Sequence, residues 1–179
     1  MSITITPNYL TVLRIFLIPS GVWALFHSPS NKWQIIAYLI FFTLGMTDIV
    51  DGRWARKSGR TTALGAFLDP VADKVLIGSA MISLAILDRF SWWVFAIIAI
   101  REVGITIFRL AVIRDGVIPA SRGGKIKTLT QNFGVGFYIL PLPESLYLFR
   151  DSLMSVAVLL TIVTGIDYVV KWYRATARK

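Results

Sequence analysis

Residues 47–74, TDIVDGRWARKSGRTTALGAFLDPVADK, hold four of the eight aspartates of a 179-residue chain that is otherwise strongly apolar. Asp48 and Asp51 are three positions apart and Asp69 and Asp73 are four apart, so each pair shares one face if its segment is helical. Two such helices would bring four carboxylates together. Because these carboxylates would repel one another in a poorly hydrated site, either most of them keep their protons or cations lie between them. Oxygen ligands of this kind favour a hard divalent ion such as Mg²⁺ or Mn²⁺.

Between the two acidic pairs we expect a basic turn that suits phosphate. Its residues are Gly52, Arg53, Arg56, Lys57, Gly59 and Arg60. Pro70 directly follows Asp69 and removes a backbone donor, so we expect a bend in the helix beside the carboxylates. The alternative is that the four aspartates lie in unrelated loops, which their spacing and apolar surroundings disfavour.

Eight fixed positions of this stretch resemble the signature of the CDP-alcohol phosphotransferase family. They are Asp48, Asp51, Gly52, Ala55, Arg56, Gly65, Asp69 and Asp73. The resemblance implies an integral membrane enzyme with six transmembrane helices, usually a homodimer, that joins a CDP-linked group to an alcohol and releases CMP. It further implies that the four aspartates hold two Mg²⁺ or Mn²⁺ ions and that Asp73 is the general base. The residues implied to bind the CDP group are Asn8, Thr11, Asp48, Gly52, Ala55, Arg56 and Gly65.

Three of these assignments have an alternative. Asn8 or Thr11 could cap the first helix, with Arg14 reaching out to the membrane interface. In the family that the chain resembles, a similar polar entry to the first helix lies over the nucleotide site, which would place both residues against substrate. Gly65, one helical turn before Asp69, also suits close packing between helices.

The composition is that of a membrane protein. Hydrophobic residues make up 55% and charged residues 16% of the chain, whereas soluble domains carry about 25% charged residues. The mean hydropathy is +0.66. The net charge of +9 favours anionic membrane lipids and phosphate-bearing substrates over nucleic acid, because a soluble nucleic-acid binder would not carry such long apolar runs. The chain has no cysteine, which excludes disulfides and thiolate catalysis, and its first residues do not resemble a cleavable signal.

Six apolar runs predict six transmembrane helices in a single membrane domain, residues 1–179, with a short N-terminal juxtamembrane segment. The runs are 9–26, 33–46, 63–87, 90–113, 129–142 and 153–170. A bilayer core needs about 20 helical residues, so the second and fifth runs must borrow flanking residues to span it. Short polar separators at 27–32, 88–89 and 141–151 fit a compact arrangement of helical hairpins.

The basic residues gather in alternate connections. One side carries Arg53, Arg56, Lys57, Arg60, Arg109, Arg114, Arg122, Lys125, Lys127, Lys171, Arg174, Arg178 and Lys179. The other side carries Lys32, Arg89 and Arg150. By the positive-inside rule, we expect both termini and the acidic site at the cytoplasmic face of the cell membrane.

Ionisable residues within the runs must face the bundle interior or a wet cavity, because each would be costly against lipid. They are Arg14, Asp69, Asp73, Lys74, Arg101, Glu102 and Arg109. Asp167 and Lys171 are four apart and are expected to pair with each other. We interpret His27 as an interfacial residue. The tryptophans expected to act as interface anchors are Trp33, Trp54, Trp92, Trp93 and Trp172.

A second basic block, residues 101–131, is expected to bind a phosphorylated acceptor alcohol. Arg109 lies within an apolar run, and the glycines of a predicted turn at 121–125, SRGGK, would offer backbone donors to an anion. The candidate acceptor-phosphate residues are Arg109, Ser121, Arg122 and Lys125. Positive-inside anchoring alone explains Arg114 and Lys127. The wording ASRGGKIKT resembles the family members that join CDP-diacylglycerol to glycerol 3-phosphate, giving phosphatidylglycerophosphate and CMP.

Two other functions stay open at this point. Sister enzymes that make phosphatidylinositol phosphate or cardiolipin would share the metal site and differ in the acceptor pocket. A small cation channel or transporter would also place carboxylates inside a helical bundle, but it would not need the phosphate turn between Gly52 and Arg56.

Overall fold

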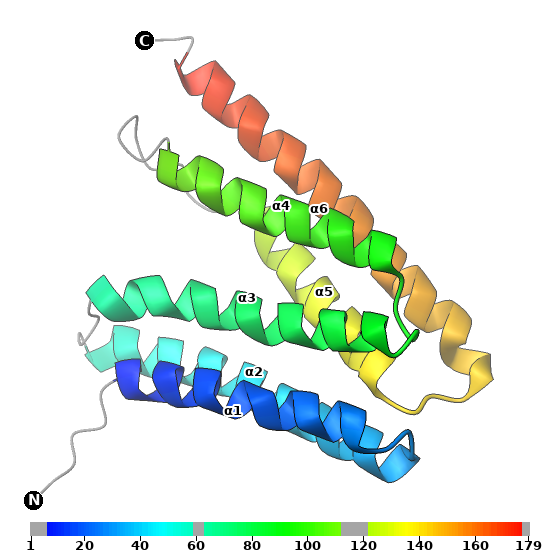
Figure 1. The fold of residues 1–179 in the computed structure, drawn as a ribbon. Coiled ribbons are helices and arrows are strands. Elements are labelled where there is room, and N and C mark those ends of the chain that lie inside the picture. Colours follow the sequence, from blue (N-terminus) through cyan, green and yellow to red (C-terminus); the bar gives the residue numbers. More distant parts are fainter. Residues whose placement is uncertain (1–6, 59–62, 112–121, 177–179) are drawn as a thin grey trace, which may run out of the picture. The chain divides into compact units, whose positions relative to one another are not determined.

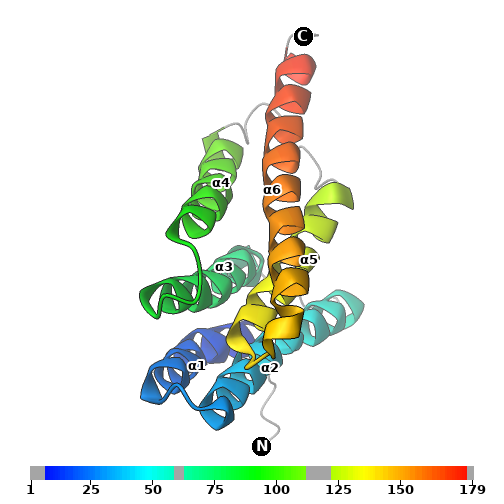
Figure 2. The ribbon, with the colours of Figure 1, turned by 90° about the vertical axis from the view of Figure 1, so that its right-hand side faces the viewer.

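The computed structural model describes residues 7–58, 63–111 and 122–176 of the chain, and within these ranges it is helical (Figure 1 and Figure 2). The helices are α1 (Pro7–His27), α2 (Asn31–Ser58), α3 (Ala63–Ile86), α4 (Trp92–Ala111), α5 (Arg122–Ile139), the short 3-10 helix η2 (Glu144–Leu146) and α6 (Tyr147–Thr176). The described side chains leave out those of residues 7–10, 48–58, 63–67, 109–111, 122, 125 and 175. The described ranges contain no strand, which confirms the all-α prediction for them.

Several helices extend beyond the apolar runs that predicted them. The second run ends at Met46, but α2 continues to Ser58 and passes through both aspartates of the first acidic pair. The prediction of a basic turn is therefore wrong for residues 52–58, which are helical. Its arginines, alanine and lysine have high helix propensity, and the single Gly52 does not end the helix. The predicted turn at 121–125 is wrong in the same way, because α5 begins at Arg122.

The chain forms two compact units, and the first comprises Met1–Arg89 with Tyr138–Pro141. Helix α1 packs against both α2 and α3. The contact with α2 is close at Gly21, where an added Cβ would lie 3.0 Å from Cε2 of Phe41. Arg89 follows a turn in which Asp88 has a φ of 53°, and its Nη2 donates to Oε1 of Gln34 (2.9 Å) and to the carbonyl of Ile139 (3.3 Å). Arg89 therefore ties residues of two distant segments into this unit.

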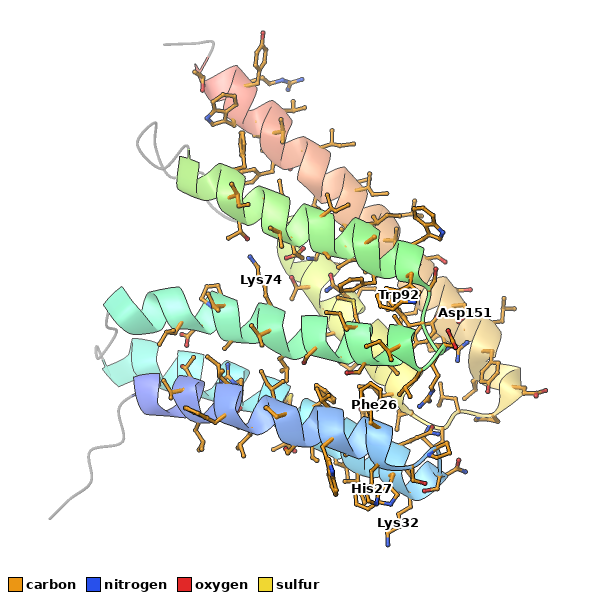
Figure 3. The ribbon with its side chains drawn as sticks, in the orientation of Figure 1. Phe26, His27, Lys32, Lys74, Trp92 and Asp151 are labelled. Carbon is orange, nitrogen blue, oxygen red and sulfur yellow. The ribbon has the colours of Figure 1, made fainter. Side chains whose placement is uncertain are left out.

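His27, labelled in Figure 3, is the last residue of α1 and packs against two tryptophans. Its ring centroid lies 4.6 Å from that of Trp23 and 4.1 Å from that of Trp33. The two tryptophans also meet edge to face. The interfacial role of His27 stays a prediction.

The second unit comprises Phe90–Phe137 and Leu142–Lys179, so it contains α4, most of α5, η2 and α6. Phe108 of α4 packs edge to face on Tyr168 and Trp172 of α6, at centroid distances of 6.1 and 5.2 Å. The predicted pair on α6 is confirmed, since Lys171 Nζ lies 2.7 Å from Asp167 Oδ2.

Large apolar side chains cover much of the surface of the described helices. Phe16, Trp93 and Leu148 are 77%, 82% and 80% exposed, while Arg14 and Lys127 are each only 2% exposed. So many exposed large apolar side chains are unusual for a soluble protein. Among the described residues, Glu144–Arg174 is the one segment long and apolar enough to cross a membrane by length and composition, so the six-span topology stays a prediction.

Candidate active site on the first three helices

The two acidic pairs lie on two helices that pack against each other. Asp48 and Asp51 fall in the second half of α2, and Asp69 and Asp73 in the first half of α3. Both spacings therefore place a pair on one helical face, as predicted. The side chains of Asp48 and Asp51 lie outside the described set, and the side chains that are described form no cluster of three His, Cys, Asp or Glu residues. The convergence of four carboxylates stays a prediction.

Asp69 is held by a residue of α1. The Thr11 hydroxyl donates to Asp69 Oδ1 over 2.6 Å, and Thr11 is 3% exposed. Thr11 lies in the second turn of α1, so the interpretation of this threonine as a helix cap is wrong. A hydrogen bond from a buried hydroxyl fixes the orientation of a carboxylate, which is the usual role of a partner behind a metal ligand.

Arg14 lies three residues after Thr11 on the same face of α1. It is 2% exposed, so it faces the interior of the first unit and does not reach out to an interface. The prediction that Arg14 faces inward is confirmed, and the snorkelling interpretation is wrong. Burial of this guanidinium places a positive charge within the packing of α1, where it favours nearby anionic groups.

The remaining nucleotide candidates lie at helix ends of the first unit. Asn8 is in the first turn of α1, Gly52, Ala55 and Arg56 are in the last turns of α2, and Gly65 is in the first turn of α3. Their side chains fall outside the described set, so their contacts with CDP stay predictions. Helix α3 continues unbroken through Pro70, and the bend expected there also stays a prediction.

The acceptor candidates belong to the second unit. Arg109 is in the last turn of α4, and Arg122 and Lys125 are in the first turn of α5. Ser121 lies outside the described residues, as do the side chains of the three basic candidates. Positions 122 and 125 share a helical face, which suits two cations that bind one anion.

The second unit also contains a buried polar network that the sequence analysis did not assign. Glu102 of α4 accepts hydrogen bonds from Arg101 Nη1 (2.9 Å) and from Lys127 Nζ of α5. Arg101 Nη2 donates to Thr164 Oγ1 of α6 over 3.0 Å. Lys127 is almost fully buried, so positive-inside anchoring is the wrong explanation for it. The sequence held one signal, because Glu102 is the only acidic residue in the apolar run 90–113.

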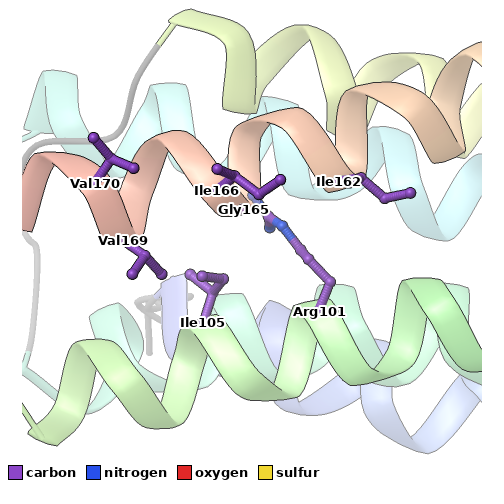
Figure 4. A pocket seen from close by; sticks show the side chains of 7 residues that line it. All are labelled: Arg101, Ile105, Ile162, Gly165, Ile166, Val169 and Val170. Carbon is purple, nitrogen blue, oxygen red and sulfur yellow. The ribbon is translucent and has the colours of Figure 1, made fainter.

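An open groove with a volume of about 410 Å³ lies between α4 and α6 beside this network (Figure 4). Its lining is Arg101, Ile105, Ile162, Gly165, Ile166, Val169 and Val170. Gly165 leaves room for Arg101, since an added Cβ would lie 3.3 Å from Arg101 Cγ. The lining of the groove is apolar apart from Arg101.

Comparison with known proteins places these features in a family. Residues 4–163 match the model of the CDP-alcohol phosphatidyltransferase family. A protein of Mycobacterium tuberculosis named "Probable phosphatidylglycerophosphate synthase" is 47% identical over 169 residues, which cover 93% of this chain and 81% of that protein.

Two further relatives are each named CDP-diacylglycerol--glycerol-3-phosphate 3-phosphatidyltransferase. The protein of Bacillus subtilis is 34% identical over 186 residues, covering 94% of this chain and 95% of that protein. The protein of Haemophilus influenzae is 38% identical over 168 residues, covering 90% of each. The family match includes the whole stretch from Asp48 to Asp73 and parts of both units. The chain therefore belongs to the CDP-alcohol phosphatidyltransferase family.

Proposed function

We propose that the chain transfers the phosphatidyl group of CDP-diacylglycerol to glycerol 3-phosphate, giving phosphatidylglycerophosphate and CMP in phospholipid biosynthesis. The names of relatives that align over most of the chain support this reaction. The structural observation that carries it is the pair of carboxylates on one face of α3, with Asp69 held by the buried Thr11 hydroxyl.

The described donors fit a divalent metal. Asp69 and Asp73 are hard oxygen donors one helical turn apart, and the hydrogen bond from Thr11 to Asp69 is typical of the group behind a metal-ligating carboxylate. We assign Asp48, Asp51, Asp69 and Asp73 as the residues that would hold two Mg²⁺ or Mn²⁺ ions. Bound there, the ions would supply positive charge to the phosphate oxygens and to the charge that develops during transfer.

Asp73 is our candidate general base. The acceptor hydroxyl loses its proton to this carboxylate while its oxygen forms a bond to the phosphatidyl phosphorus. The bond from that phosphorus to the CMP oxygen breaks, and CMP leaves with the electron pair. Phosphoryl transfer depends mainly on the positioning of the reacting groups. We therefore assign the nucleotide candidates to hold the CDP group: Asn8, Thr11, Gly52, Ala55, Arg56 and Gly65.

The acceptor phosphate needs cationic partners. We assign this role to Arg109, Ser121, Arg122 and Lys125. Arginine can bind a phosphate through two parallel N–H donors, which adds orientation to charge. This arrangement would favour glycerol 3-phosphate over an unphosphorylated alcohol.

We further propose that all six α-helices cross the cell membrane, with both termini and the active site at the cytoplasmic face. The α-helices have 18 to 30 residues. At about 1.5 Å per residue, they would span roughly 27 to 45 Å, against a bilayer core of about 30 Å. Their exposed apolar side chains suit contact with lipid, and the basic residues predict the orientation.

The single family match from residue 4 to residue 163 supports one membrane domain, and we expect a homodimer.

Purified protein with CDP-diacylglycerol and a panel of acceptors would test this function by CMP release. We expect turnover with glycerol 3-phosphate and far less with glycerol, inositol 1-phosphate or phosphatidylglycerol. Preference for inositol 1-phosphate or phosphatidylglycerol would point to a sister enzyme. No CMP release with any acceptor, together with cation flux through liposomes, would support the channel instead.

A further inference from the structure

We propose that Glu102 is a positioning residue for the acceptor site, because its ion pair with Lys127 fixes the rotation of α5 and thereby orients Arg122 and Lys125. This inference rests on the proposed function for the identity of the acceptor. The helix contacts behind it lie entirely within the second unit.

The pair joins two helices in a place where either charge alone would be costly. Lys127 of α5 is 2% exposed, and Glu102 of α4 is half-buried. Breaking a buried ion pair leaves an uncompensated charge, which is strongly unfavourable. Successive side chains of an α-helix point in directions about 100° apart. A rotation of α5 by one residue position would therefore move Lys127 away from Glu102. The ion pair therefore selects one rotation of α5.

The helical register separates Lys127 from the acceptor candidates. Positions 125 and 127 differ by about 200° around the helix axis, whereas positions 122 and 125 share a face. Lys127 therefore holds the opposite side of α5 from the face that carries Arg122 and Lys125. Lys127 in this position sets the direction of the face that carries positions 122 and 125, although it does not itself belong to that face.

Glu102 is itself fixed by α6. Arg101 donates to Glu102 through Nη1 and to Thr164 through Nη2, at 2.9 and 3.0 Å. Gly165 gives the arginine side chain the space to pass. The carboxylate of Glu102 is thus shared by two cations, which suits a fixed junction of α4, α5 and α6 better than it suits a proton acceptor.

Replacing Glu102 by glutamine tests the inference in the full-length enzyme. We expect Glu102→Gln to raise the KM for glycerol 3-phosphate by about tenfold and to change the KM for CDP-diacylglycerol by less than about threefold. The matched control is Asp167→Asn, which also removes a carboxylate paired with a lysine, but at an exposed site. This control should leave both KM values unchanged. An equal rise in both KM values for Glu102→Gln would overturn the inference.

A double-mutant cycle separates positioning from direct binding. If Glu102 and Lys127 act only as a pair, Lys127→Met should match Glu102→Gln, and the double variant should be no worse than either. Lys127→Arg, which keeps the cation, should retain most of the native affinity for glycerol 3-phosphate. If the two losses multiply in the double variant, Glu102 and Lys127 act independently, and the positioning role of their ion pair is refuted.

A spectroscopic measurement can detect a rotation of α5 relative to α4 without measuring enzyme turnover. The chain has no cysteine, so spin labels can be attached at Val103→Cys on α4 and Ile126→Cys on α5, two exposed positions. The distance distribution between the labels should be narrow in the native background and broader with Glu102→Gln. If the unmutated enzyme does not use glycerol 3-phosphate, the proposed function fails while this measurement still tests the positioning. An unchanged distribution would refute the positioning; if Glu102→Gln does not fold, Glu102→Asp should give a smaller broadening.

Discussion

Replacing Thr11 with valine would test the link between α1 and the acidic face of α3. The substitution removes one hydroxyl, which donates to Asp69 Oδ1 over 2.6 Å. Thr11 is 3% exposed, so water has little access to replace the lost donor. A hydrogen bond to a charged group contributes about 1.5 to 3 kcal/mol, which corresponds to a factor of about 10 to 150 in an equilibrium constant.

The assay is CMP release measured against the concentration of free Mg²⁺. If Asp69 is a metal ligand oriented by Thr11, Thr11→Val should raise the Mg²⁺ requirement and lower kcat/KM by about 10- to 100-fold, as is typical for partners of metal ligands. Thr11→Ser keeps the hydroxyl and should restore most of the activity. These effects should appear while the protein remains folded in detergent.

A second buried threonine provides the control. Thr161 on α6 is fully buried, and its hydroxyl donates over 2.7 Å to the carbonyl of Ala157 in the same helix. Thr161→Val makes the same chemical change without touching a carboxylate, so its Mg²⁺ dependence should be native. Native Mg²⁺ dependence in Thr11→Val would refute the role of Thr11, and an equal loss in Thr161→Val would show that the effect is not specific to the site.

Three further predictions concern the base, the topology and the packing. Asp73→Asn should lower kcat by at least about 100-fold without unfolding the protein, because the amide cannot take the proton from the hydroxyl group of the alcohol substrate. Near-native CMP release would exclude Asp73 as the general base. In intact cells, an impermeant thiol reagent should label Ser30→Cys but not Ser58→Cys, and labelling at position 58 would reverse the proposed orientation. Gly21→Ala should lower the free energy of unfolding by about 1 to 3 kcal/mol, since its Cβ would approach an aromatic ring of α2. Gly78→Ala is its control, with no atom within 4 Å of the added Cβ, and should change that free energy by less than about 1 kcal/mol; equal thermal shifts would contradict the packing argument.

The apolar runs predicted the number and order of the α-helices within the described residues but not the ends of these helices. The second run stops at Met46 because the residues after it are polar, whereas α2 continues to Ser58. Apolar periodicity reports where a helix is buried or meets lipid, and helix propensity continues past that limit. The error had a functional consequence, since it assigned residues from Gly52 onward to a turn when they belong to the last turns of α2.

The candidate site was predictable where its residues lie close together in the sequence. Helical spacing alone paired Asp69 with Asp73, and both lie on α3. The contact between Thr11 and Asp69 spans 58 positions, so local pattern offered no way to find it. It depends on how α1 packs against α3, which is a tertiary property. The sequence could therefore locate the carboxylates without identifying the hydroxyl that orients one of them.

If α4 and α5 cross the membrane as proposed, their charged residues explain why hydropathy alone does not identify them as spans. Glu102 and Lys127 reduce the apolar character of their helices, yet each is the partner of the other in the packed unit. A span that contributes to a polar site must exchange apolar residues for charged ones, and in a bilayer such charges would be tolerated where they are paired inside a bundle. We therefore expect the helices that carry function in this family to be the hardest to recognise as spans from hydropathy. Helix α6 agrees with this argument, because its charged residues lie toward its two ends and residues 152–166 between them carry no charge. The charged residues are Arg150, Asp151, Asp167, Lys171 and Arg174.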